Sequence, residues 1–324
     1  MESDARFEVL DARQVALIET ARKANGYISR AKSDNTRRAY AADWRAFTDW
    51  CAEHRVTPLP VEPRALALYL TDMADKYKVS TIERRLGAIN FEHKKAGHPA
   101  PSTHPGVREL LQGIRRELGA ARTGQTPLLT DEIRAMVEAV PETPAGDRDR
   151  ALILLGFAGA LRRSELAALQ RKDIRFTAQG MVVTVSRSKT DQDGHGAEVG
   201  IERGAHPATD PVRAVVAWIE AAKLEDGPLF RSVDKHGHIR ATGLSGYGIT
   251  TIIQRAAERA GLVVEGSAIS AHSLRAGHAT AAAEAGAEER SIMRQGRWKT
   301  ERTVRGYIRH GSLFTENSSG KLGI

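Results

Sequence analysis

Apolar residues in the first third of the chain recur every three or four positions, which is the spacing of one face of an α-helix. The clearest run, residues 33–51, begins with the polar capping residues Ser33 and Asn35 and places its apolar side chains at Tyr40, Trp44, Phe47 and Cys51. Similar patterns, separated by proline and glycine, predict helices over residues 63–76, 80–97 and 104–118. Residues 11–24 can form one further helix. We therefore expect a small helical bundle over residues 33–118.

A glycine-containing polar segment, residues 119–128, is typical of a linker. Beyond it, the helical spacing returns over residues 130–140, 147–160, 211–222, 249–261, 273–286 and 289–295, before a final segment around Tyr307. Two β-rich runs, residues 180–188 and 197–204, flank a polar turn and predict a hairpin. The patterning thus predicts a mainly α protein, with a helical domain at residues 1–118 and a mixed, mostly α domain with a small β-hairpin at residues 129–324.

The composition agrees with two ordinary domains, since 324 residues with 41% hydrophobic content can bury two cores. No run approaches the roughly 20 apolar residues that span a bilayer, and the polar start lacks the features of a signal peptide. We therefore expect a cytoplasmic protein without a membrane partner. Cys51 is the only cysteine, which excludes an intrachain disulfide, and its apolar neighbours predict a buried structural thiol.

A net charge of +8 favours a polyanionic partner, although many proteins of similar charge bind no nucleic acid. Residues 1–120 carry 20 Lys and Arg against 16 Asp and Glu, and the remainder carries 28 against 24. The positive charge therefore belongs to both predicted domains and is not confined to a tail.

Four segments of the second domain hold polar residues that a simple core does not require: GALRRSEL, SRSKTDQDG, AHSLRAGH and GRWKTERTVRGYIR. In this order they resemble the catalytic segments of the tyrosine site-specific recombinases of the phage integrase family. The matching residues are Arg162, Lys189, His272, Arg275, Trp298 and Tyr307. Each alone has an ordinary structural explanation, but their ordered coincidence favours the resemblance. A Trp where most relatives have His indicates the Cre-like branch, and residues 33–51 and 80–97 resemble two helices of its DNA-facing core-binding domain.

The chemistry of this family explains the residue types. Two guanidinium groups, those of Arg162 and Arg275, can hold the negative charge that develops on a phosphodiester under attack. The nucleophile, Tyr307, has an ordinary pKa of about 10 and needs a base, for which His272 is the candidate. Lys189 matches the acid that protonates the leaving 5′ oxygen. The indole N–H of Trp298 can donate a hydrogen bond but cannot transfer protons.

Glu165, three residues after Arg162 on a helical turn, is expected to orient an arginine or His272. The resemblance implies a 3′-phosphotyrosyl intermediate, a free 5′-hydroxyl and a Holliday junction, with neither ATP nor a metal ion. We expect no cofactor. His236 and His238 lack neighbours of metal-ligand type, so we also expect no metal site there.

Five basic residues of the first domain are candidates for DNA contacts: Arg37, Arg38, Arg84, Arg85 and Lys94. They lie opposite the apolar helix faces, where basic residues often simply face solvent. The resemblance to Cre favours contacts that combine phosphate anchoring with some base recognition. Asn90 lies in the apolar stripe of its helix and is expected to pack rather than to read bases.

The resemblance implies two domains that close around double-stranded DNA at inverted repeats, and a homotetramer on two such sites. The residues after Tyr307 are expected to dock on a neighbouring subunit. Two alternatives stay open: an enzyme like the type IB topoisomerases, and a catalytically silent DNA-binding accessory factor. Whether the role is integration, excision, dimer resolution or transposition stays open, although a simple two-site recombinase is favoured over an integrase with its own arm-binding domain.

Overall fold

The computed structural model describes residues 34–119, 126–186, 196–262 and 269–311, together with residues 17, 19, 20, 22, 23 and 322. The chain divides into two compact units, Met1–Arg122 and Thr123–Ile324, which we name the N-terminal and C-terminal units. Of the helix expected at residues 11–24, five positions are described, and all five are helical. Within the described part of the chain, no helix has the length and apolar character needed to cross a membrane.

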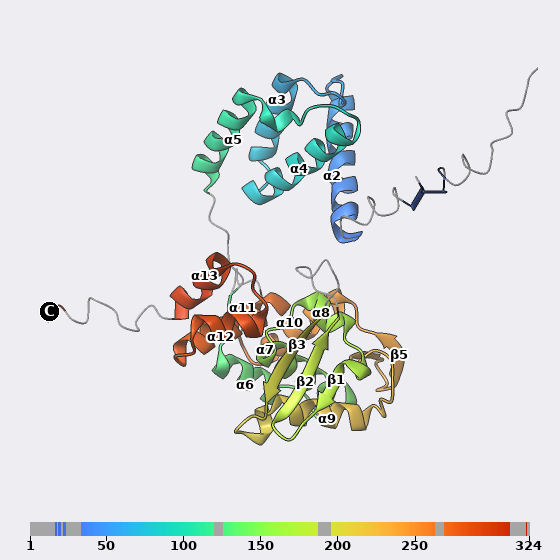
Figure 1. Ribbon diagram of the computed structural model, residues 1–324, viewed down its shortest axis with the longest axis vertical. Coiled ribbons are helices and arrows are strands. Elements are labelled where there is room, and N and C mark those ends of the chain that lie inside the picture. The colour runs from blue at the N-terminus through green and yellow to red at the C-terminus, as the bar shows by residue number, and fades with distance from the viewer. Residues whose placement is uncertain are drawn as a thin grey trace, which may run out of the picture. The chain divides into compact units, whose positions relative to one another are not determined.

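The main elements of the N-terminal unit are α2 (Asp34–Glu53), α3 (Pro63–Ala74), α4 (Val79–Lys95), the short 3₁₀ helix η1 (Pro101–Thr103) and α5 (Pro105–Leu118) (Figure 1). The helices expected here are confirmed. α3 and α5 both begin with proline, at the position where a missing N–H costs no helical hydrogen bond. Their apolar faces meet in one core, to which Phe47, Leu70 and Ile89 contribute fully buried side chains. Cys51 lies in this core, as expected, and burial raises the pKa of its thiol to about 11.

The helices of the C-terminal unit are α6 (Thr130–Glu138), α7 (Pro144–Ala158), α8 (Arg163–Ala168), α9 (Pro211–Ala221), α10 (Gly246–Arg259), α11 (Ala271–Glu284), α12 (Glu289–Gly296) and α13 (Glu301–Gly311). α7 is the central helix, because residues 151–156 are buried without interruption. It begins three residues earlier than expected, since the Thr143 hydroxyl accepts a hydrogen bond from the Gly146 amide at 3.1 Å and caps the helix.

The expected hairpin is present as β2 (Gly180–Val185) paired antiparallel with β3 (Ala197–Glu202). A third strand, β1 (Ile174–Phe176), extends it to a sheet of order β1-β2-β3, and β4 (Arg231–Val233) pairs separately with β5 (Ile239–Gly243). The sequence patterns did not reveal β1, β4 or β5. At Gly180 a Cβ atom would lie 2.1 Å from the Ile201 carbonyl oxygen, so glycine is required for the close approach of β2 and β3.

α11, α12 and α13 pack together in the C-terminal unit (Figure 1). Ala279, Ile292 and Val304 form their small core, against which Trp298 and Tyr307 pack. α12 is also attached to the rest of the unit, because the Gln295 side-chain amide donates to the carbonyl oxygens of Ala158 and Gly200, each at 3.0 Å. The three helices thus form a platform that is fixed to both α7 and the sheet.

Candidate active site

Tyr307 on α13 and His272 at the start of α11 are joined by a hydrogen bond of 2.8 Å between the phenolic oxygen and Nε2. The start of α11 is fixed by Ser270, whose hydroxyl accepts from the His272 amide at 3.1 Å. Ser273 completes the cap, because its hydroxyl accepts from the Ser270 amide at 3.1 Å. The first turn of α11 therefore holds the imidazole within hydrogen-bond distance of the tyrosine hydroxyl.

Burial lowers the pKa of His272, and the positive charges of Arg275 and Arg162 lower it further. Burial also raises the pKa of Tyr307, an effect that Arg275 partly opposes. Both groups are therefore neutral at pH 7. In that state the phenol can donate its proton to Nε2, which is the arrangement that a nucleophile and its base require.

Arg275 lies one turn after His272 on α11 and is only 2% exposed. Its Cζ atom lies 4.0 Å from the centre of the Trp298 ring, and its Nη1 donates to the Ala160 carbonyl. Nη2 is buried and has no hydrogen-bond partner among the described residues. Burial and the nearby Arg162 and Arg297 lower the pKa of Arg275 to about 9, so the group stays charged at neutral pH. A buried, charged donor without a partner is suited to receive an anion.

Trp298 separates Arg275 from the platform core, with its ring 6.2 Å from that of Tyr307. Its position depends on Gly296, since a Cβ atom there would lie 1.7 Å from the indole. The Trp298 amide donates to the Met293 carbonyl at 3.0 Å, which closes the end of α12. The tryptophan is thus held by α12 on one side and by a guanidinium on the other.

Arg162 immediately precedes α8, and its Nη1 donates to Glu165 Oε1 at 2.6 Å. Glu165 is fully buried, and its Oε2 accepts from the Arg162 amide at 2.8 Å and from Arg297 Nη2 at 2.8 Å. Burial alone would raise the pKa of Glu165, but the charges of Arg297 and Arg162 outweigh it and lower the pKa. Glu165 is therefore a carboxylate that orients Arg162, one of the two roles expected from the sequence.

The structure therefore gathers the side chains of Arg162, Glu165, His272, Arg275, Trp298 and Tyr307 from α8, α11, the end of α12 and α13. Lys189 lies outside the described residues, in the segment between Ser186 and Gly196 that joins β2 to β3. Its place in the site stays a prediction from the sequence.

Sequence reasoning assigned no role to Arg297, although this residue lies beside Trp298 and binds Glu165. Its neighbours in sequence, Arg294 and Lys299, are exposed basic residues, so nothing in the local pattern marks Arg297 as buried. His278, on the same helix as His272, has a different character. It contacts the ring of Phe157, and burial lowers its pKa to about 4, which indicates a neutral structural histidine.

The DNA-contact candidates of the N-terminal unit differ in their surroundings. Arg37 and Arg38 on α2 and Lys94 on α4 are exposed. Arg84 is half-exposed and forms an ion pair with the buried carboxylate of Asp43. These four side chains remain accessible to a large ligand.

Arg85 was expected on the exposed face of α4, and that expectation is wrong. Its side chain is only 16% exposed, with Nη1 donating to the Tyr69 hydroxyl at 3.2 Å and Cζ lying 4.4 Å from the centre of the Tyr77 ring. The physical reason is Asp43, whose buried carboxylate lies 3.7 Å from Arg85 Nε and needs a nearby positive charge. Arg85 therefore packs the bundle.

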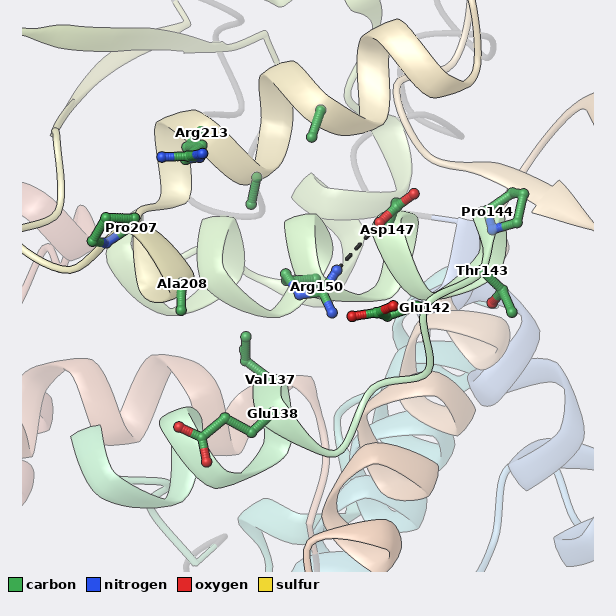
Figure 2. A pocket seen from close by; sticks show the side chains of 12 residues that line it. Val137, Glu138, Glu142, Thr143, Pro144, Asp147, Arg150, Pro207, Ala208 and Arg213 are labelled. Atoms are coloured by element: carbon green, nitrogen blue, oxygen red, sulfur yellow. Dashed lines mark hydrogen bonds and ion pairs between the residues drawn. The ribbon is translucent and has the colours of Figure 1, made fainter.

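A cavity of about 650 Å³ lies elsewhere in the C-terminal unit, among α6, α7, α9 and the turn before α9. Figure 2 shows the side chains that line it. Its polar lining includes Glu138, Glu142, Arg213 and the ion pair of Asp147 with Arg150 at 3.2 Å. None of the catalytic candidates among the described residues lines it. The clustered arginines, and not this cavity, therefore define the candidate active site.

Comparisons with known proteins agree with this geometry. Residues 127–312 match the family described as "Phage integrase family". An integrase/recombinase xerD homolog of Selenomonas ruminantium is 38% identical over 93% of this chain and 89% of its own length. Recombinase cre of Escherichia phage P1 is 27% identical over 86% of this chain and 85% of its own.

Among solved structures, the chain shares its fold with a Tn1549 transposon integrase in complex with transposon right end DNA. The TM-score is 0.62 at 13% identity, over 90% of this chain and 94% of that one. A lambda integrase dimer bound to a core site gives a TM-score of 0.61 at 17% identity, over 93% and 82% of the two chains. The family match covers more than half of the chain, and the xerD homolog matches nearly all of it. The protein therefore belongs to the phage integrase family of tyrosine recombinases.

Proposed function

We propose that this protein is a site-specific recombinase that cleaves and rejoins duplex DNA through a covalent 3′-phosphotyrosyl link at Tyr307. The observation that carries the proposal is the contact of Tyr307 with His272 at 2.8 Å, beside the buried guanidinium of Arg275. A nucleophile, a base and an anion-binding group thus meet in one place. This combination is suited to transesterification at a phosphodiester.

In the cleavage step, the phenolic oxygen of Tyr307 attacks the scissile phosphorus while the bond from phosphorus to the 5′ oxygen breaks. The phenolic proton passes to His272 Nε2, which is already within hydrogen-bond distance. The 5′ oxygen leaves as a hydroxyl with a proton that we assign to Lys189. Because the phosphotyrosyl bond conserves the energy of the phosphodiester, a second 5′-hydroxyl can reverse these steps without ATP.

Arg162 and Arg275 would stabilise the negative charge that grows on the non-bridging oxygens during this step. Nη2 of Arg275 has no partner among the described residues, so a phosphate oxygen would satisfy a buried donor. Arg162 is 19% exposed at its side chain and oriented by Glu165, which leaves part of its guanidinium open to a ligand. Trp298 would pack against Arg275 and offer its indole N–H to the same phosphate.

We infer that duplex DNA is the substrate and that the N-terminal unit contributes to its binding. The exposed Arg37, Arg38 and Lys94, with the half-exposed Arg84, would contact phosphates, and this part of the affinity should fall steeply as salt rises. We assign Arg85 a structural role, because its guanidinium already binds the Tyr69 hydroxyl and the Asp43 carboxylate.

Recombination of two sites requires four active subunits, and we propose a homotetramer on two sites with inverted repeats. A groove of about 550 Å³ lies between α7, β3, α11 and α12, with apolar walls that include Ile201, Ala282 and Ile292. Among the described strands, β3 forms one edge of its sheet, where a further segment of chain could pair. We propose that this groove receives the residues that follow Tyr307 in a neighbouring subunit.

A plasmid that carries two copies of a candidate site, taken from inverted repeats beside the gene, tests the function against its alternatives. A recombinase yields deletion or inversion products and a Holliday junction that depend on both sites. An enzyme like the type IB topoisomerases relaxes the plasmid whether or not a site is present. A silent DNA-binding factor retards the DNA and changes neither its sequence nor its topology. Either of the last two results would overturn the proposal.

A further inference from the structure

Arg297 has a backbone conformation that arginine rarely adopts. It ends α12 with φ 55° and ψ 44°, in the left-handed region that favours glycine. Its side chain turns inward and is only 10% exposed. Both features cost free energy, and such residues persist where surrounding contacts require them.

The Arg297 guanidinium joins the end of α12 to the turn that precedes Arg162. Its Nη2 donates to Glu165 Oε2 at 2.8 Å and to the Ala160 carbonyl at 3.4 Å. The same Ala160 carbonyl accepts a hydrogen bond from Arg275 Nη1. In the other direction, the main-chain carbonyl of Arg297 accepts from Arg162 Nη2 at 3.4 Å. Arg297 therefore contacts Arg162 itself and shares a partner with Arg275.

The charge of Glu165 is divided between two cations, since Oε1 accepts from Arg162 at 2.6 Å and Oε2 from Arg297 at 2.8 Å. A fully buried carboxylate needs such compensation. If Arg162 supplied all of it, the pair would be neutral and its attraction for a phosphate would be weakened. With Arg297 included, the cluster of three keeps a net positive charge.

We propose that Arg297 is a positioning residue for DNA strand transfer, which holds Arg162 and Arg275 in place through Glu165 and the Ala160 carbonyl without itself touching DNA. This inference rests on the proposed function and adds a residue to it. Trp298 follows directly in the chain, so the same contacts fix the start of the segment that leads to Tyr307.

The test compares Arg297→Gly and Arg297→Lys with the wild-type full-length protein. Glycine suits the left-handed backbone, so Arg297→Gly removes the guanidinium and relieves the unfavourable conformation together. We expect its single-turnover cleavage of nicked DNA to fall by roughly 10- to 100-fold, a range typical of coupled neighbouring groups. DNA affinity should stay close to that of the wild type, and the melting temperature of each variant is measured so that cleavage is compared below the onset of unfolding. Arg297→Lys should recover part of the rate because the positive charge is kept. Arg294→Ala, at an exposed arginine of the same helix, is the matched control and should cleave normally.

A double-mutant cycle with Glu165→Gln separates positioning from simple stability. If Arg297 acts through Glu165, Arg297→Gly costs much less activity in the Glu165→Gln background than in the wild type. Wild-type cleavage by Arg297→Gly would overturn the inference, as would equal losses in both backgrounds. The failure of the wild-type protein itself to form a Tyr307-dependent adduct would instead overturn the proposed function.

Discussion

The phenolic oxygen of Tyr307 lies 2.8 Å from Nε2 of His272, and this hydrogen bond joins α13 to α11. It places a proton acceptor at the nucleophile without any movement of either helix. A preorganised contact of this kind reduces the entropy that must be lost in the transition state. The remaining parts of the site are arranged around this pair, with Arg275 one turn along α11 and Trp298 against its guanidinium.

The first prediction concerns pH. Cleavage needs neutral His272 as a base, and burial together with Arg275 lowers the pKa of this group below its ordinary value of about 6.5. The base form therefore persists to lower pH, and kcat/KM should decrease only when the pH falls below about 6.5. His272→Gln should lower the cleavage rate by roughly 10²- to 10⁴-fold, and the decrease of kcat/KM at low pH should disappear in this variant. If kcat/KM began to fall at a pH well above 6.5, or if His272→Gln showed the same decrease at low pH as the wild type, His272 could not be the base.

The second prediction concerns the two arginines. Arg162→Lys and Arg275→Lys keep the charge but lose the planar fork of donors. We expect single-turnover cleavage to fall by about 10²- to 10³-fold, corresponding to about 2.7–4 kcal/mol, as when one oxyanion donor is removed. Arg175→Lys on β1 is the control, because Arg175 forms an exposed ion pair with Glu198 and none of the described active-site side chains contacts it. Normal cleavage by either active-site variant would move phosphate binding to other residues.

The third prediction tests the support of Trp298. Gly296→Ala places a methyl group 1.7 Å from the indole, so the ring must leave its contact with Arg275. We expect the C-terminal unit to lose about 1–3 kcal/mol of unfolding free energy, as in other overpacked sites, and cleavage to decrease. The matched control is Gly113→Ala on α5, where the added methyl group would meet nothing within 4 Å apart from its chain neighbours and the backbone of its own helix. Stability should stay the same or rise by about 0.4–1 kcal/mol. Thermal unfolding of both variants and of the wild type tests this prediction. Equal melting temperatures for Gly296→Ala and Gly113→Ala would refute the steric argument.

The fourth prediction concerns Lys189. If it protonates the leaving oxygen, Lys189→Ala should cleave ordinary DNA slowly but should cleave normally when the 5′ bridging oxygen is replaced by sulfur. The sulfur leaving group needs no acid, since a thiolate is far more stable than an alkoxide. Arg275→Lys serves as the control and should stay slow on the sulfur substrate, because its defect lies in phosphate binding. A lysine variant that sulfur does not rescue would make Lys189 a binding residue.

Much of the fold could be predicted because the helices carry a strong three-to-four spacing, as in α2, and because β2 and β3 flank a polar turn. β1 was missed since three residues are too few to show an alternation. β5 was missed because four of its five residues are exposed, which leaves no apolar alternation to read. Pairing between distant segments, and not local pattern, makes these strands.

The candidate site, like the fold, could be predicted from the sequence only in part. The catalytic candidates could be named from the sequence because four segments resemble, in order, the catalytic segments of the tyrosine recombinases, including the three positions from His272 to Arg275. The role of Arg297 could not, since its burial depends on Glu165, 132 positions away in the chain. The exposure of Arg85 was overestimated for a related reason, because its partner Tyr69 belongs to another helix. Buried charges are set by tertiary contacts that periodicity does not record.

The most direct test of the central claim is covalent trapping at Tyr307. The wild-type protein and Tyr307→Phe are incubated in EDTA with nicked DNA that carries a candidate site, and the products are resolved on a denaturing gel. The predicted result is a covalent protein–DNA band for the wild type, with none for Tyr307→Phe although that variant still binds the DNA. A band of equal strength with Tyr307→Phe, or no band from wild-type protein bound to a site that it recombines, would contradict the account.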